Sequence, residues 1–124
     1  MKNWKTIDMP RQNDTFILER TFTLKQMNIL RKGNNPRSMD DKWFFYMESN
    51  TLYAHRSWTG YCIYKIDFSQ DNQHKVIVNR DPKQYKRTNI NEDREILNKL
   101  LDCWLGMQPS IPNCGKKLIV GIFL

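Results

Sequence analysis

The chain contains few of the residues from which metal and cofactor sites are usually built. Its three cysteines, Cys62, Cys103 and Cys114, lie far apart, and no C-x-x-C pair is present. The histidines are also few, namely His55 and His74. Because structural zinc sites need four closely spaced ligands, we expect no metal and no cofactor. We expect the cysteines to be unpaired, which is typical of proteins from a reducing compartment.

Long apolar runs are also absent. No stretch approaches the ~20 apolar residues of a membrane-spanning helix, and residues 1–5 do not resemble the start of a signal peptide. With 40% hydrophobic and 27% charged residues, the composition excludes a disordered tail and a membrane protein. We therefore expect a cytoplasmic protein of one domain, residues 1–124. Residues 1–14, which are polar and broken by Pro10, are expected to form a loosely ordered arm.

Familiar catalytic motifs are missing, whereas positive charge is in excess. The sequence contains no G-x-G-x-x-G, P-loop, H-E-x-x-H or paired-carboxylate motif. Its 20 basic and 13 acidic residues give a net charge of +7, which favours an anionic partner. No basic run is longer than two residues. Because nucleic-acid-binding proteins usually concentrate their charge more strongly, a small anionic ligand is favoured over nucleic acid, and a merely solvated basic surface is the alternative.

The hydrophobic patterns predict an α+β fold. We expect a single antiparallel meander sheet of about four to six strands with two helices packed on it. The expected strands cover residues 15–22, 42–48, 51–56, 61–68, 74–79 and 118–124.

Both helices carry recognisable end signals. Thr23 and Gln26 match a capping box, and Gly33 is a typical helix end. The apolar face of this first helix consists of Leu24, Met27 and Leu30. Asn91 is the expected cap of the second helix, which ends near Gly106. The apolar stripe of the second helix consists of Ile96, Leu97, Leu100, Leu101 and Trp104.

A two-residue turn at residues 49–50 would fix the register of the hairpin around it. The pairs on one face are then Met47–Leu52, Phe45–Ala54 and Trp43–Arg56. The pairs on the other face are Tyr46–Tyr53 and Phe44–His55. The pair of Trp43 and Arg56 predicts a cation–π contact. The second, aromatic face would favour a homo-oligomer if neither helix covers it.

Two polar segments hold the groups best suited to binding an anion, residues 55–61 (HRSWTGY) and 79–87 (NRDPKQYKR). Both follow strands that end at the same edge of the expected meander, so we expect them to converge. Arginine forks bind phosphate, and hydroxyl and amide groups donate hydrogen bonds. The predicted ligand-binding residues are Trp43, Arg56, Ser57, Trp58, Thr59, Gly60, Asn79, Arg80 and Tyr85.

These residues predict a protein that binds an anionic nucleotide-type small molecule. Arg56 and Arg80 would take phosphates. Trp43, Trp58 and Tyr85 would stack or wall the pocket, and Ser57, Thr59 and Asn79 would supply hydrogen bonds. Three alternatives remain open. The protein is a small enzyme acting on a nucleotide or an ADP-ribose-like substrate, with His55 as general acid or base, or it is a module that binds RNA or single-stranded DNA, or it inhibits a partner protein.

The same segments resemble a group of short bacterial and phage proteins of unassigned function. The strings are D-K-W-F at 41–44, H-R-S-W-T-G-Y-C-I-Y at 55–64 and N-R-D-P-K-Q-Y at 79–85. The resemblance covers roughly residues 15–105 and implies that the two polar segments belong together, without implying a catalytic residue. Because the site is rich in donors and aromatic rings but lacks a recognisable catalytic group, we expect such a protein to sequester a nucleotide immune signal, an anti-defence role, without turnover.

Overall fold

Five antiparallel strands form one sheet, in the order β1-β5-β4-β3-β2. The structure is a computed structural model that describes residues 6–33 and 42–106. Its elements are β1 (Asn13–Glu19), α1 (Leu24–Lys32), β2 (Trp43–Glu48), β3 (Thr51–Arg56), β4 (Cys62–Asp67), β5 (Gln73–Asn79) and α2 (Ile90–Trp104). The prediction of an α+β fold with one antiparallel meander sheet and two helices is confirmed. The strand predicted over residues 118–124 lies outside the described residues.

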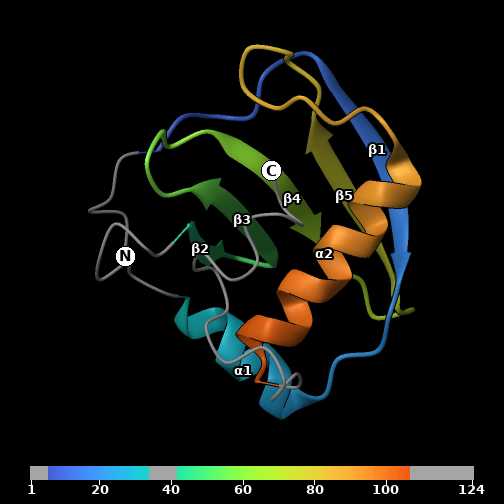
Figure 1. The fold of residues 1–124 in the computed structure, drawn as a ribbon. Coiled ribbons are helices and arrows are strands. Elements are labelled where there is room, and N and C mark those ends of the chain that lie inside the picture. Colours follow the sequence, from blue (N-terminus) through green and yellow to red (C-terminus); the bar gives the residue numbers. More distant parts are fainter. Residues whose placement is uncertain (1–5, 34–41, 107–124) are drawn as a thin grey trace.

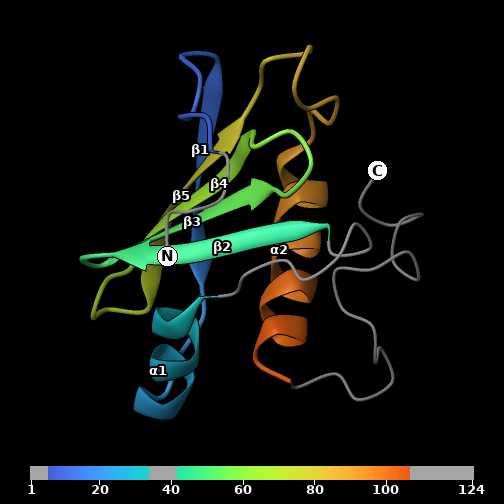
Figure 2. The same ribbon diagram turned by 90° about the vertical axis from the view of Figure 1, so that its left-hand side faces the viewer.

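The long helix α2 crosses one face of the sheet, which we call the helix side (Figure 1). The shorter helix α1 lies at one end of the sheet, near the C-terminal end of α2 (Figure 2). The core between α2 and the sheet includes Phe16, Leu18, Phe45, Leu52, Tyr64, Ile66, Val76, Val78, Leu97, Leu100 and Leu101. We call the opposite face of the sheet the outer face.

The capping box of α1 is confirmed. Thr23 Oγ1 accepts the Gln26 N–H at 3.1 Å, and Gln26 Oε1 accepts the Thr23 N–H at 3.0 Å. Gly33 follows the helix with a φ of 64° and donates its N–H to the Leu30 carbonyl. The predicted apolar face is wrong at Leu24, which is 86% exposed. It occupies the first helical position, where its side chain is exposed to solvent.

The helix α2 begins two residues earlier than predicted. Its cap is Asn89, whose side chain accepts the N–H groups of Asn91 and Glu92. Asn89 has the extended backbone of a cap residue, whereas Asn91 already lies inside the helix. The predicted apolar stripe is confirmed, because Ile96, Leu97, Leu100 and Leu101 are buried and Trp104 packs against the core.

The predicted register of the β2–β3 hairpin is confirmed at every pair, including Trp43 opposite Arg56. Ser49 takes the positive φ, 55°, that a tight hairpin turn requires. On its other side, β3 pairs with β4 through an irregularity that places Ala54 opposite Tyr64 and His55 opposite Cys62.

Part of the N-terminal arm is more ordered than predicted. The Ile7 N–H donates to the Gly60 carbonyl at 2.8 Å, and the Arg80 N–H donates to the Gln12 carbonyl at 2.8 Å. Residues 13 and 14 belong to β1. Backbone pairing therefore holds residues 7–14 against the sheet.

The cysteines differ from the expectation of three unpaired thiols. Cys62 is a buried free thiol, but Cys103 is disulfide-bonded. Unpaired cysteines therefore no longer argue for a reducing compartment, and the cytoplasmic location stays a prediction. Over residues 6–33 and 42–106, no helix has the length and apolar character needed to cross a membrane.

Candidate anion-binding site

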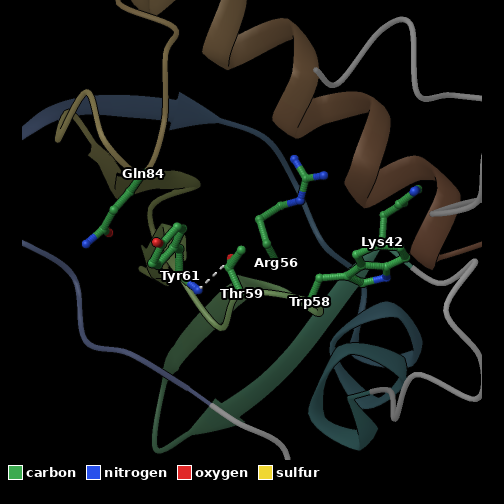
Figure 3. A pocket seen from close by; sticks show the side chains of 6 residues that line it. All are labelled: Lys42, Arg56, Trp58, Thr59, Tyr61 and Gln84. Atoms are coloured by element: carbon green, nitrogen blue, oxygen red, sulfur yellow. Dashed lines mark hydrogen bonds between the residues drawn. The ribbon is translucent and has the colours of Figure 1, made fainter.

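A pocket opens on the helix side, where β3 ends. Its lining residues are Lys42, Arg56, Trp58, Thr59, Tyr61 and Gln84. We call it the Arg56 pocket, and its volume is about 250 Å³. Figure 3 shows Arg56 between Thr59 on one side and Lys42 and Trp58 on the other.

Backbone hydrogen bonds hold the turn that carries this pocket. The Arg56 N–H donates to the Tyr61 carbonyl at 2.9 Å, and the Gly60 N–H donates to the Arg56 carbonyl at 2.8 Å. Beside the turn, the Ser57 N–H donates to the Lys42 carbonyl at 3.0 Å. Gly60 has a φ of 80°, which side chains other than glycine rarely adopt. The lining residues are therefore positioned by paired backbone.

Arg56 is the central cation of the pocket. Its guanidinium lies over the Trp43 ring, 5.3 Å from the centroid, which confirms the predicted cation–π contact. Across residues 6–33 and 42–106, this guanidinium donates no hydrogen bond and has no carboxylate partner. Burial lowers the pKa of Arg56, since it removes water from the charged group. A desolvated cation without a carboxylate is costly, so the site suits an anion.

Lys42 supplies the second cation. Its Nζ lies over the Trp58 ring, 5.1 Å from the centroid. Trp58 is 58% exposed, so its indole is accessible from solvent at the pocket mouth. The described lining residues carry two positive charges and no carboxylate. The net charge of the described lining residues is therefore positive.

Arg80 has a different role from the one predicted. Its Nε donates to Asp14 at 2.8 Å, and its Nη2 donates to the fully buried Asp93 at 2.5 Å. Its Nη1 donates to the carbonyls of Asn79 and Arg87. Arg80 does not line the Arg56 pocket, and four of its five N–H groups donate hydrogen bonds within the fold. We therefore correct the predicted phosphate contact to a structural ion-pair network.

Other predicted site residues do not line the pocket but make hydrogen bonds within the fold. The Tyr85 hydroxyl donates to Asp93 at 2.7 Å and lies in the core. The Asn79 side chain donates to the Cys62 carbonyl and to Gln84, each at 2.9 Å. Trp43, Ser57 and Gly60 also lie outside the pocket lining. Of the nine predicted residues, the structure places Arg56, Trp58 and Thr59 on the pocket lining.

Three lining residues were not among the predicted ligands, namely Lys42, Tyr61 and Gln84. The hairpin register itself could have found Lys42, because pairing 43 with 56 places 42 beside 57. Gln84 lies within the second polar segment, and Tyr61 within the first. Each was therefore inside or next to a recognised cluster.

His55 lies away from the Arg56 pocket. Neighbouring side chains of a strand point to opposite faces, and His55 is buried on the outer face. Its Nδ1 donates to the Gly60 carbonyl at 2.8 Å, because a carbonyl oxygen can only accept. It lines a hollow of about 260 Å³ together with Asp8, Met9, Tyr46, Glu48, Tyr53, Cys62 and Lys65. The predicted general acid or base is thus separated from the pocket by the sheet.

The outer face also bears on reactivity and on assembly. Burial raises the pKa of the Cys62 thiol to about 12, so the thiol is a poor nucleophile.

The aromatic residues Phe44, Tyr46 and His55 on the outer face are buried. Their burial removes the exposed aromatic patch on which the expected homo-oligomer depends, and the oligomeric state stays a prediction.

In the part of the chain that the structure describes, no group of three or more His, Cys, Asp or Glu residues could hold a metal ion. Comparison of the chain with protein-family models, with curated proteins and with solved structures finds no match. The similarity to short phage and bacterial proteins therefore stays a hypothesis, and the function must be argued from the pocket.

Proposed function

We propose that this protein binds an anionic, nucleotide-type small molecule in the Arg56 pocket and does not turn it over. The observation that carries the proposal is Arg56 itself, a desolvated guanidinium for which the described residues provide no carboxylate. A bound phosphate would supply the missing negative charge. Charge-assisted hydrogen bonds from a guanidinium fork to phosphate are among the strongest in proteins.

The size of the pocket indicates which part of the ligand it encloses. Its volume of about 250 Å³ is below the ~300–1,000 Å³ of pockets that enclose a drug-sized ligand. We therefore place the phosphate end inside, against Arg56 and Lys42. The base would lie at the mouth, on the exposed surface of Trp58. Thr59 and Gln84 supply further polar contacts.

The absence of turnover is supported by the chemistry of the lining. Among the described lining residues there is no histidine, carboxylate or cysteine. General acid–base catalysis most often uses a histidine or a carboxylate within hydrogen-bond reach of the reacting atoms. Binding without conversion is compatible with sequestration of a nucleotide signal, including the anti-defence role that the phage resemblance suggests.

Single-stranded RNA or DNA is the second candidate ligand. The observation that favours it is the exposed Trp58 beside two cations, since such proteins stack bases on aromatic rings next to basic groups. A bound strand would extend beyond the pocket and contact several phosphates. Its affinity would then depend steeply on salt.

The test is a calorimetric titration of the purified chain with the four ribonucleoside 5′-monophosphates and with a short single-stranded oligonucleotide. The variant is Arg56→Met. Its matched control is Arg94→Met, because Arg94 also lies over a ring, 5.1 Å from the Phe16 centroid. We expect at least one mononucleotide to bind, with an affinity that falls ~30–1,000-fold in Arg56→Met, from the ~2–4 kcal/mol of a charged bidentate contact. The Arg94→Met variant should bind like the wild type.

Equal affinities in Arg56→Met and Arg94→Met would contradict the proposed site. A salt slope steeper than about −2 for the oligonucleotide, with no mononucleotide binding, would favour the nucleic-acid alternative. Chromatography of the ligand after long incubation tests turnover, and conversion to a product would contradict sequestration.

A further inference from the structure

We infer that the Arg56 pocket selects a terminal phosphate monoester, which is a dianion, over a phosphodiester, which is a monoanion. This inference depends on the proposed function and adds the ligand class. Phosphate monoesters include nucleoside 5′-monophosphates. Diesters include cyclic nucleotides and the internal phosphates of RNA and DNA.

The charge of the lining is the first argument. Arg56 and Lys42 contribute two positive charges, and the other described lining residues, Trp58, Thr59, Tyr61 and Gln84, include no carboxylate. A dianionic phosphate neutralises both cations. A diester leaves one positive charge unbalanced in a site where Arg56 is already desolvated. The pocket is therefore electrostatically complementary to two negative charges.

The placement of the two cations is the second argument. Arg56 is at the end of β3, and its Cζ lies over the Trp43 ring, 5.3 Å from the centroid. Its guanidinium offers five N–H donors in a planar fork. Lys42 precedes β2 and is held over Trp58. Two cations from different segments of the chain can contact different oxygens of one phosphate, and a terminal phosphate offers three such oxygens while a diester offers two.

A matched pair of lysines isolates the contribution of the second charge. Lys42 lies 5.1 Å from the centroid of Trp58 and lines the pocket. Lys65 lies 5.4 Å from the centroid of Tyr53 and lines the hollow on the outer face. The substitutions Lys42→Met and Lys65→Met each remove one positive charge and one cation–π contact. The first, and not the second, changes the charge of the Arg56 pocket.

The experiment compares each ribonucleoside 5′-monophosphate with its phosphate methyl ester by calorimetric titration. The methyl group converts the dianion into a monoanion and leaves the base and the sugar unchanged. We expect the monophosphate to bind the wild-type chain at least about ten-fold more tightly than its methyl ester. In Lys42→Met this ratio should fall to about three or less, while in Lys65→Met it should equal the wild-type ratio.

Each outcome decides one of the two claims. Equal or tighter binding of the methyl esters to the wild type would overturn the selection for a dianion and leave the proposed function intact. If Lys42→Met lowers the ratio no more than Lys65→Met does, any preference for the dianion does not come from the second cation of the Arg56 pocket. That result would also overturn the inference and leave the proposed function intact. If neither ligand class binds the wild type at about 1 mM, the proposed function fails, and the inference fails with it.

Discussion

Substituting Asp93 by Asn should destabilise the protein more than any single change at its surface. Asp93 lies in the first turn of α2, and its side chain is fully buried. It accepts hydrogen bonds from Arg80 at 2.5 Å and from the Tyr85 hydroxyl at 2.7 Å. Asparagine has nearly the same shape, but it removes the charge and turns an N–H₂ group toward these donors.

The expected loss follows from the burial of the ion pair. Breaking a buried pair by neutralising one partner typically costs ~3–5 kcal/mol, because the other charge stays buried. This is a large share of the ~5–15 kcal/mol by which most domains are stable. The Tyr64 and Tyr85 hydroxyls lie 3.0 Å apart and each carries one hydrogen. Removing only the second hydroxyl, in Tyr85→Phe, should therefore cost less, ~1–2 kcal/mol.

Urea unfolding followed by tryptophan fluorescence measures these losses. With a denaturant slope of about 1.5–2 kcal/mol per M, Asp93→Asn should lower the midpoint by about 2 M. The matched control is Asp14→Asn, since Asp14 also pairs with Arg80 but is 47% exposed. Exposed pairs contribute ~0–1 kcal/mol. Equal losses in the two variants would refute the reasoning, and Tyr85→Phe supplies a measurable comparison if Asp93→Asn does not fold.

Three further predictions concern other elements. His55→Phe removes the buried hydrogen bond to the Gly60 carbonyl and should cost ~1–2 kcal/mol in urea unfolding; an unchanged midpoint would contradict this role. Because burial raises the pKa of Cys62 to about 12, on the order of 10⁻⁴ of it is thiolate at about pH 8. Peptide mapping should show Cys62 unmodified by iodoacetamide in the native protein and modified in urea, and equal modification would contradict its burial. Thr23→Ala should cost ~1 kcal/mol in thermal unfolding, while Thr23→Ser, which keeps the oxygen bonded to the Gln26 N–H, should not.

Local signals were sufficient to predict most of the fold. The turn at residues 49–50 and the alternation on both sides of it determine the register that pairs Trp43 with Arg56. The capping box at Thr23 likewise uses contacts three residues apart. The cap of α2 could not be decided in this way, because Asn89 and Asn91 are chemically equal and only the backbone conformation distinguishes them.

The site was predicted less completely, and two arginines show why. Arg56 and Arg80 both end strands at the same edge of the sheet, and both were expected to bind phosphate. Arg80 is instead neutralised by Asp14 and Asp93, which come from β1 and α2. No local pattern indicates these partners, since the first is 66 residues away in the sequence. Which arginine is paired with carboxylates inside the fold is therefore decided by tertiary contacts.

Nuclear magnetic resonance of the isotope-labelled chain tests the binding site most directly. A ribonucleoside 5′-monophosphate, added to about 1 mM, should shift the guanidinium Nε–H resonance of Arg56 and the indole N–H resonance of Trp58. The imidazole resonances of His55, on the outer face, should stay in place. Shifts confined to the outer face, or unchanged Arg56 and Trp58 resonances, would contradict the assignment of the Arg56 pocket as the anion-binding site.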